Sequence, residues 1–541
     1  MRFRAHPAAS ISISCRRFLH RVRLVIAAAL CLVSLHAPPA SAQELRIAIA
    51  TEPSSLDPLF RLVGPDEQIA RHFFDSLVLQ DDRQRPMPGL ALSWRTVDDT
   101  TWEFRLRPGV RFSDGSLFTA KDVAASLHRA VSLQNSIGGY GIYTRQVTKA
   151  EIVDDYTIRL HTAAPYPTMP LDLSPVWIVS HKVAEEPTEA FNAGKAVIGT
   201  GPFRLVQWVR GERLVLERND DYWGRKPIWK RVVMRFIPND SARIAALLAG
   251  DVDLIELVPP SAIEQIKANP ALRLVTGISA RAMYLNLDSS RERTPFAVDA
   301  QGNPLPANPL RDKRVRLAIS KAIDRQAIVE RIMQGVAEPA GQLVPGDYFG
   351  ASTKLRPEPY DPEGARALLA AAGYPNGFGI TFQVPNDRYV SAEKVGIAIG
   401  QMLSRVGIET RVDAMPEAIY KSRASKFEFS LFMLGWYSEA PEASNSLRGI
   451  VATRDAARGW GSANRGRYSN PVFDALLQKA VATADDRARA ALLAEAMEMA
   501  MEDAAVIPLY FEGSAWAFRK DLAYTPRLDQ FTLAQEVTRA E

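Results

Sequence analysis

An acidic side chain follows a strand-like segment and a Gly-Trp-Tyr turn in FEFSLFMLGWYSEAPEA, residues 427–443. Glu439 comes two residues after Gly435, Trp436 and Tyr437, and Glu442 comes three residues later. Carboxylates are seldom buried without a partner, but one at the wall of a cleft can form a charge-assisted hydrogen bond to a cation. From the residues alone, the acid behind this strand is interpreted as a solvated loop acid.

Catalytic and metal-binding patterns are missing elsewhere. The histidines beyond residue 42 are His72, His128, His161 and His181, and no pair has the spacing of a zinc-binding helix. The chain has no Gly-x-Ser-x-Gly elbow and no Gly-Lys-Ser/Thr phosphate loop, and IGGYG at 137–141 is interpreted as an ordinary loop. The acid pairs at 220–221 and 251–253 fit a turn and a strand start. We expect no catalytic residue, no metal and no cofactor.

The first 42 residues have the order of an export signal. Six arginines and no acid are present, the apolar run LVIAAALCLVSL covers 24–35, and ASA at 40–42 offers a cleavage site. Twelve apolar residues are few for a membrane span, so an uncleaved anchor is the weaker alternative. The sequence predicts a cleaved signal peptide, by the Sec or the Tat route, and a periplasmic protein.

Removing that signal changes the charge and the cysteine count. The formal charge of +5 comes from 66 basic and 61 acidic residues, and six of the basic residues lie in the signal. The rest of the chain then carries 60 basic and 61 acidic residues, which gives no reason to expect a nucleic-acid partner. Cys15 and Cys31 also lie in the signal, so we expect neither a disulfide framework nor thiol chemistry.

Strands and helices alternate along the remaining chain. Helices are predicted at 119–131, capped by Thr119 with Asp122, after caps at Asp240 and Asp361, and over 391–408, 471–480 and 484–503. Strands are predicted at 44–50, 101–112, within 213–238, and at 252–257, 409–414, 427–436 and 505–511. Such alternation predicts an α/β architecture with a mixed or mostly parallel sheet and boundaries near 175, 280 and 505.

Several segments together resemble the extracellular solute-binding proteins of peptide-type ABC importers, solute-binding protein family 5. They follow the family's order and cover nearly the whole chain after residue 42: EPSSLDP (52–58), PGLALSWRTVDDTTWEFRLRPGVRFSDGSLFTAKDV (88–123), GTGPFRLVQWVRGERLVLERNDDYWGRKP (199–227), IPNDSARIAALLAGDVDL (237–254), NPLRDKRVRLAISKAIDRQAIV (308–329), YDPEGARALLAAAGYPNG (360–377), GRYSNPVFDALLQKA (466–480) and IPLYF (507–511).

The resemblance implies a type II periplasmic binding protein with two lobes, a two-strand hinge and an extra inserted domain. Lobe I would take 43–65, 176–279 and 506–541, the inserted domain 66–175 and lobe II 280–505, with crossings at 280–288 and near 505–509. A monomer would close its lobes on a ligand and dock on permease subunits in the inner membrane, with the ATPase on a separate chain.

The same resemblance implies a ligand site. In peptide-binding relatives, a segment like Gly435-Trp436-Tyr437 gives backbone hydrogen bonds to an extended ligand, and an aspartate in the place of Glu439 pairs with its α-ammonium. Here a longer acid and EAPEA replace the family's usual pattern. Further expected contacts are four arginines for anionic ligand ends, two tyrosines and one serine: Arg281, Arg388, Arg448, Arg467, Tyr284, Tyr389 and Ser54.

These features predict a receptor for short peptides or peptide-like amino compounds. An opine, a sugar conjugate or another carboxylated metabolite is the alternative within this class, and a metal chelate fits less well because no histidine follows residue 181. A secreted hydrolase is the alternative from another class, but it would need an activated nucleophile that the sequence does not show.

Overall fold

The computed structural model describes residues 43–133, 139–438, 440–456 and 458–540. The predicted export signal, residues 1–42, and Glu439 therefore lie outside the described residues. The chain divides into two units, Met1–Glu44 and Leu45–Glu541, and the second contains the cores of the fold.

A mixed 12-stranded sheet dominates the described part of the chain. β15 pairs in parallel with β16 and β17, and β1 pairs in parallel with β11. Antiparallel pairs of this sheet include β12 with β17 and with β18, β9 with β8 and β10, and β18 with β11. In spatial order its strands are β13 (Ala297–Val298), β15 (Phe378–Pro385), β17 (Leu431–Tyr437), β12 (Leu272–Leu287), β18 (Ile507–Arg519), β11 (Leu254–Ile255), β1 (Glu44–Ile49), β10 (Arg231–Phe236), β9 (Arg213–Arg218) and β8 (Phe203–Val209), with β14 (Glu338–Pro339) on β18 and β16 (Ile408–Met415) on β15.

Smaller sheets complete the strand inventory of the described residues. An antiparallel four-stranded sheet has the order β4 (Ala91–Asp98), β5 (Thr101–Leu106), β7 (Thr157–Thr162) and β6 (Val147–Asp154). Two further pairs are β2 (Val78–Gln80) with β3 (Pro86–Pro88) and β19 (Leu522–Ala523) with β20 (Thr538–Arg539). The four-stranded sheet lies within 66–175, where the sequence predicts an inserted domain.

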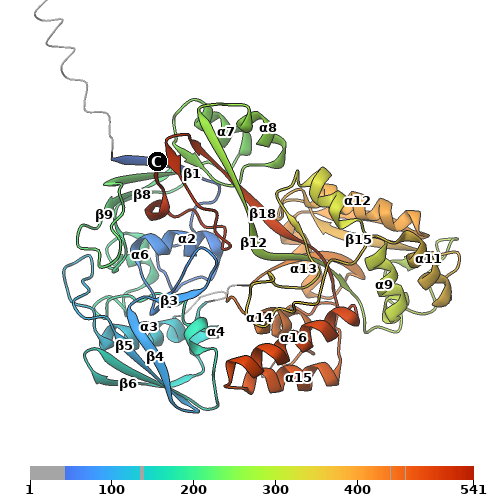
Figure 1. Ribbon diagram of the computed structural model, residues 1–541, viewed down its shortest axis with the longest axis horizontal. Coiled ribbons are helices and arrows are strands. Elements are labelled where there is room, and N and C mark those ends of the chain that lie inside the picture. The colour runs from blue at the N-terminus through green and yellow to red at the C-terminus, as the bar shows by residue number, and fades with distance from the viewer. Residues whose placement is uncertain (1–42, 134–138, 439, 457, 541) are drawn as a thin grey trace, which may run out of the picture. The chain divides into compact units, whose positions relative to one another are not determined.

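Helices pack around these sheets (Figure 1). The α-helices are α2 (Gly64–Phe73), α3 (Ala120–Ser132), α4 (Gly141–Thr144), α5 (Met169–Asp172), α6 (Thr188–Asn192), α7 (Asp240–Leu248), α8 (Ile263–Lys267), α9 (Lys313–Lys321), α10 (Arg325–Ala327), α11 (Pro362–Ala371), α12 (Ala392–Arg405), α13 (Glu417–Ser425), α14 (Ala443–Ser446), α15 (Pro471–Ala482) and α16 (Asp486–Glu502). Short turns of other helix types are η1 (Pro260–Ala262), η2 (Pro309–Arg311), η3 (Ile328–Ile332), η4 (Leu447–Val451) and η5 (Ala534–Glu536).

Two large apolar cores share the sheet. One contains residues from 45–236 together with 516–537, and the other contains residues from 283–510. A further core joins α15 and α16 to η4 and to parts of β12. Burial of apolar surface on both sides of the sheet thus gives each half of the molecule its own stabilising core.

β12 and β18 connect the two large cores. They run side by side along most of their length (Figure 1), with Leu272 opposite Arg519 and Leu285 opposite Ile507. Their ladder is irregular between Ile278 and Ala282, near the point where both strands pass from one core to the other. Gly513 lies opposite Ile278, and a β-carbon there would overlap the carbonyl oxygen of Val336. Glycine is therefore required at this close approach.

Local signals in the sequence are confirmed where they act over a few residues. α3 begins after Thr119 with a capping box to Asp122. α11 begins after Asp361, whose side chain accepts a hydrogen bond from the Gly364 N–H, as the sequence predicts. The strand pair expected within 213–238 is present as β9 and β10.

Other predicted limits are wrong by several residues. The cap of α7 is Asn239, which accepts a hydrogen bond from the Ala242 N–H, whereas Asp240 is already the first helical residue. β17 starts at Leu431 rather than at residue 427, because Phe427 has a φ of 60° and belongs to the turn after α13. β11 covers only Leu254–Ile255, and β18 continues eight residues beyond the predicted end at 511, as far as Arg519.

Candidate ligand-binding site

The end of β17 has one paired and one unpaired edge. Residues 431–437 all pair with β12, but on the opposite side β15 pairs only with Leu431 and Phe432. Ser438 donates its N–H toward β12, to the Ala280 carbonyl at 3.3 Å, whereas Gly435 donates its N–H to the Tyr389 hydroxyl at 3.0 Å. Since backbone groups of alternate residues face opposite edges, those of Gly435 and Tyr437 face away from β12.

Gly435 provides close packing at this edge. A β-carbon at residue 435 would stand 2.7 Å from the Met283 sulfur and 2.8 Å from Cε1 of Tyr389. Next to it, Trp436 donates from Nε1 to Asn445 Oδ1 at 3.0 Å, and its ring leaves no room for a side chain on Gly449. The Gly-Trp pair therefore brings backbone and an aromatic wall close to the unpaired edge.

A cavity of about 220 Å³ opens beside this edge, and we call it the β17 pocket. It brings together five of the residues that the sequence predicts as ligand contacts: Tyr284, Arg388, Tyr389, Gly435 and Trp436. The rest of its lining comes from Pro385, Glu417, Tyr420, Lys421, Ala424, Leu434, Ala463 and Arg465. α13 supplies Glu417, Tyr420 and Lys421, and the segment between η4 and α15 supplies Arg465.

Three tyrosine hydroxyls of the β17 pocket are neutral. Burial raises the pKa of Tyr284, Tyr389 and Tyr420 above the usual value for tyrosine. The Arg465 guanidinium acts on the pKa of Tyr284 and Tyr420 in the opposite, weaker sense, which places its charge near both rings. Tyr420 donates its hydroxyl to the Met433 carbonyl at 2.5 Å, on the same edge of β17 as Gly435.

The cations of the β17 pocket outnumber its acids. Arg388 pairs with Glu417, with 3.2 Å between Nε and Oε1. Lys421 is exposed and Arg465 is half-buried, and within 43–133, 139–438, 440–456 and 458–540 neither has a carboxylate within ion-pair distance. The lining therefore holds three cationic groups and one carboxylate.

Arg281 and Tyr437 lie at the β12 side of the same strand end. Arg281 Nε pairs with Glu512 Oε2 at 3.1 Å, and its guanidinium carbon lies 5.7 Å from the centre of the Tyr437 ring. Glu512 also accepts a hydrogen bond from the Val390 N–H at 3.0 Å. Arg281 thus contacts the Tyr437 ring, and through Glu512 it is linked to the segment of Tyr389. Its charge is paired with a carboxylate of the protein itself.

Tyr437 reaches the other half of the molecule through Gln84. The Gln84 amide nitrogen donates to the Tyr437 hydroxyl at 2.9 Å, and its carbonyl oxygen accepts from the Tyr348 hydroxyl. On the same loop, Arg83 Nε pairs with Asp347 Oδ2 at 3.1 Å, and both side chains are about half exposed. The hairpin loop between β2 and β3 therefore touches Tyr348 and Tyr437, which pack in the further core with α15 and α16.

Three other predicted contacts do not line the β17 pocket. Arg467 pairs with Asp288 at 3.4 Å. Arg448 donates to the Ser444 carbonyl at 3.3 Å. The Ser54 hydroxyl donates to Asp66 at 2.6 Å, and the Ser54 N–H donates to the same carboxylate at 2.6 Å. Glu439, the residue that first suggested a site, lies outside the described residues.

Sequence reasoning missed Arg465, Lys421, Tyr420 and Gln84. Arg465 stands two residues before Arg467 in NRGRYSN, and the sequence offered no means of choosing between them. Lys421 and Tyr420 are adjacent on a helix whose polar pattern is typical of a solvated surface. Gln84 lies more than 250 residues from both of its tyrosine partners.

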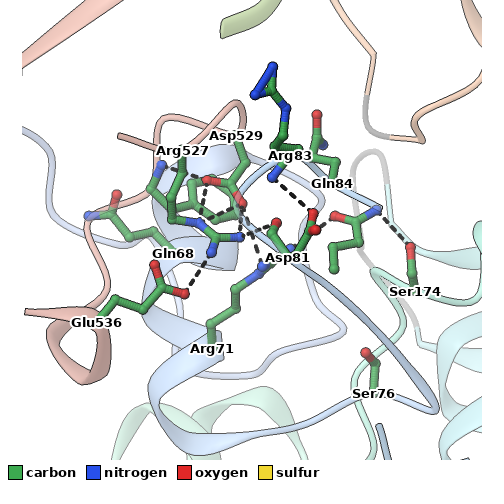
Figure 2. A network of polar contacts seen from close by, with 12 residues as sticks. Gln68, Arg71, Ser76, Asp81, Arg83, Gln84, Ser174, Arg527, Asp529 and Glu536 are labelled. Carbon is green, nitrogen blue, oxygen red and sulfur yellow. Dashed lines mark hydrogen bonds and ion pairs between the residues drawn. The ribbon is translucent and has the colours of Figure 1, made fainter. Parts of the chain in front are cut away.

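A second group of charged residues lies around α2 and the C-terminal segment, and we call it the α2 charge cluster (Figure 2). Arg527 grips Asp529 through two nitrogens, at 3.0 and 2.6 Å, and pairs with Glu536 at 2.6 Å. Arg71 approaches the same Asp529 carboxylate at 3.5 Å. Glu67, buried near them, completes the cluster, and burial raises its pKa to about 7.

Membrane and metal features are not found in the described ranges. No helix there has the length and apolar character needed to cross a bilayer. No group of three or more His, Cys, Asp or Glu side chains in those ranges has a metal-binding arrangement.

The sequence model of the bacterial extracellular solute-binding proteins, family 5, matches residues 85–458. The chain belongs to this family. Its members are substrate-binding components of ABC importers, and the two large cores on one sheet are the two lobes of that fold. The lobe with the first core is lobe I, and the lobe with β15, β17 and the β17 pocket is lobe II.

Individual family 5 proteins resemble the chain over nearly its full length. The glutathione-binding protein GsiB of Pectobacterium atrosepticum is 29% identical over 514 residues, covering 92% of this chain and 95% of GsiB. The periplasmic binding protein DppA of Helicobacter pylori, solved with the peptide STSA, is 26% identical with a TM-score of 0.73, covering 92% of this chain and 98% of DppA. The binding protein AgaA of Agrobacterium tumefaciens R10, solved with agropinic acid, is 25% identical with a TM-score of 0.71, covering 92% and 99%.

Proposed function

We propose that this family 5 protein works in the periplasm, where it captures short peptides or peptide-like amino compounds between its lobes for a membrane permease. The observation that carries this proposal is the edge of β17 at Gly435–Tyr437, which β15 does not cover and where the Gly435 N–H donates to a side chain, the Tyr389 hydroxyl. An extended ligand can add to such an edge as a further strand, so that backbone hydrogen bonds give affinity without regard to side chains. The glutathione-binding and peptide-binding relatives support this ligand class.

The proposed contacts divide by ligand group. Gly435 and Tyr437 bind the ligand backbone, Trp436 and Tyr389 form the wall, and Glu439 pairs with the ligand ammonium. Tyr284 and Arg388 face the ligand from the β17 pocket. Arg281 acts through Tyr437 as a positioning residue, because its charge is paired with Glu512. Ser54, Arg448 and Arg467 are left out of the proposed site because their side chains bond elsewhere.

Lobe closure completes the proposed site. We propose lobe I as 43–65, 176–279 and the C-terminal segment, the inserted domain as 66–175 and lobe II as 280–505. The change of core along β12 near Ala282 supports the first proposed crossing, and the change of core along β18 supports a second proposed crossing near Gly513. Gln84 and Arg83 of the inserted domain meet Tyr437, Tyr348 and Asp347 of lobe II, and contacts that bring the two sides together favour the closed state.

A carboxylated amino compound is the second candidate ligand. The excess of cations in the β17 pocket favours it, as does the relative solved with agropinic acid. Both candidates carry an amino group for Glu439, and they differ in whether a peptide backbone is present.

Thermal unfolding with ligand pools tests the proposal. The protein without residues 1–42 is heated with di- to pentapeptides and with the same peptides N-acetylated. A ligand at about 100 times its dissociation constant adds roughly 2.7 kcal/mol of stability, enough to raise the midpoint. We expect a rise with the free amines only, and Glu439→Gln should weaken their binding by about 1–3 kcal/mol because it removes a charge-assisted bond.

The opposite results have distinct meanings. A rise with acetylated peptides that equals the rise with free amines removes Glu439 from the site. No rise with either pool contradicts peptide binding and leaves the carboxylated amino compound as the candidate, which agropinic acid as a probe then tests directly.

A further inference from the structure

We propose that the β17 pocket is a subsite for an anionic arm of the ligand, a carboxylate carried on a side group rather than on the ligand's backbone ends. The inference rests on the proposed function, because it takes the ligand to lie along the unpaired edge of β17. It assigns Arg465 and Lys421 as the residues that select for this arm, and neither was expected from the sequence.

The β17 pocket has more cationic than acidic side chains in its lining. Glu417 is the acid of the pocket lining, and it is already paired with Arg388 at 3.2 Å. Arg465 and Lys421 have no carboxylate partner within the described ranges, and both line the same small cavity. Two cations that face one cavity repel each other and attract an anion into it, more strongly where side chains exclude water.

Burial makes Arg465 a stronger binding group for an anion than the exposed Lys421. Its side chain is half-buried, and its charge acts on the buried hydroxyls of Tyr284 and Tyr420. Neutral tyrosine hydroxyls cannot compensate a guanidinium charge, although they can donate or accept hydrogen bonds around a carboxylate. A guanidinium in this position can hold a carboxylate through two parallel hydrogen bonds.

The size of the cavity limits what enters it. Whole small ligands usually occupy cavities of about 300–1,000 Å³, whereas the β17 pocket has about 220 Å³. It therefore has room for one arm of a ligand and not for the entire molecule. Side groups of an added strand alternate between its two faces, so an arm next to Gly435, which has no side chain of its own, can turn into the pocket.

Six tripeptides test this assignment by calorimetric titration at low salt. Three carry one glutamate, as Glu-Ala-Ala, Ala-Glu-Ala and Ala-Ala-Glu, and three carry glutamine in its place. Each pair differs by one charge and has nearly the same shape. We expect the wild-type protein to prefer glutamate about tenfold at one of the three positions, the size of one charge-assisted bond.

Two variants and one matched control identify the residues responsible. In Arg465→Gln and in Lys421→Gln the preference should fall to about twofold, whereas the affinity for the glutamine peptide stays nearly constant. Arg465→Lys should retain most of the preference because it keeps the charge. Lys426→Gln removes an exposed lysine just after α13 that does not line the pocket, and its preference should equal that of wild type.

The outcomes separate the subsite from the proposed function. Equal binding of glutamate and glutamine peptides by wild type overturns the subsite and leaves peptide capture standing. A preference that survives unchanged in Arg465→Gln also overturns it. If none of the six peptides binds to wild type, the proposed function fails and the subsite fails with it.

Discussion

The α2 charge cluster and the β17 pocket use charged side chains in opposite ways. In the cluster, the side chains of Arg527 and Asp529 are each about 1% exposed, and two guanidinium nitrogens of Arg527 make three hydrogen bonds to Asp529, with Glu536 and Arg71 beside them (Figure 2). In the pocket, Arg388 alone has an acidic partner among the described residues, and Lys421 and Arg465 have none.

The difference shows how structural charges are distinguished from ligand-binding ones. A larger cavity, of about 530 Å³, lies next to the α2 charge cluster. Arg71, Asp75, Asp81 and Glu536 on its wall are bonded to other residues, and among the described residues Asp82 and the exposed Arg225 have no ion pair. Between these two cavities, volume alone would favour the one beside the α2 charge cluster as the ligand site. The sign of the unpaired charges favours the β17 pocket for an anion: Lys421 and Arg465 are both cations, whereas the unpaired charges of the larger cavity are one acid, Asp82, and one cation, Arg225.

The sharpest test of the comparison is Asp529→Asn. It leaves the buried Arg527 guanidinium without its main partner, so the free energy of unfolding should fall by about 3–5 kcal/mol. Denaturation followed by tryptophan fluorescence measures the loss. Arg465→Gln is the control from the other region and should change stability by less than about 0.5 kcal/mol, since it breaks no ion pair among the described residues. Similar losses in both variants would contradict the comparison.

Glu67 gives the α2 charge cluster a pH dependence. Burial raises its pKa from 4.5 to about 7, so between these values the folded protein holds a proton that the unfolded chain releases. Stability from this group therefore falls as pH rises from about 4.5 to about 7. In Glu67→Gln that loss disappears, and the variant should gain about 2–3 kcal/mol on wild type across this window.

His72 contributes a pH dependence of stability with the opposite sign, and it is present in both the wild type and Glu67→Gln. Its Nδ1 bonds to the Gln68 carbonyl and its Nε2 accepts the Ala534 N–H, and burial lowers the pKa of the imidazole to about 4. Stability from His72 thus rises with pH between about 4 and 6.5. Taking the difference between variant and wild type at each pH removes this contribution, and a difference that stays flat with pH would exclude a buried proton on Glu67.

The smallest effect is expected for Gln84→Ala, at the loop that joins the two regions. Arg527 and Leu528 hold this loop through the Asp81 and Asp82 carbonyls, and Gln84 bridges Tyr348 and Tyr437 across the lobes. Loss of the bridge should weaken the closed state by about 1 kcal/mol and so lower ligand affinity about fivefold. Alanine keeps the φ of 60° equally unfavourable, so the change reports the amide.

Arg83→Gln is the matched control on the same loop. Its ion pair with Asp347 also crosses between the lobes, but the two side chains are 56% and 46% exposed, so affinity should stay within about twofold of wild type. Stopped-flow dissociation of a bound peptide compares the two variants. Equal dissociation rates for Gln84→Ala and wild type would mean that the bridge adds nothing to closure.

Sequence signals recovered the fold where they act locally. The caps of α3 and α11 and the β9–β10 pair depend on residues within a few positions or one turn of each other. The family resemblance supplied the two lobes. The Gly-Trp-Tyr segment marked the end of β17, but its residues are the last three of the strand and not the predicted turn. Five of the eleven predicted contact residues meet in the β17 pocket.

The remaining parts of the site depend on partners distant in sequence. Arg281 was expected to be available for a ligand, but Glu512, 231 positions away, holds it. Arg465 and Arg467 have the same local sequence, and only the fold turns one toward the pocket and the other toward Asp288. Which charges find a protein partner is settled by tertiary contacts, and local patterns carry no information about them.

Gly513 and the irregular ladder between β12 and β18 bear on how this receptor moves. The lobes are joined by a ribbon of paired strands, so a change in their angle can be taken up by twisting the ribbon while its hydrogen bonds stay intact. A ribbon that twists without breaking behaves as a torsion spring. Gly513 lies within this ribbon, where a side chain would collide with the Val336 carbonyl, so a larger residue there should change the resting twist between the lobes.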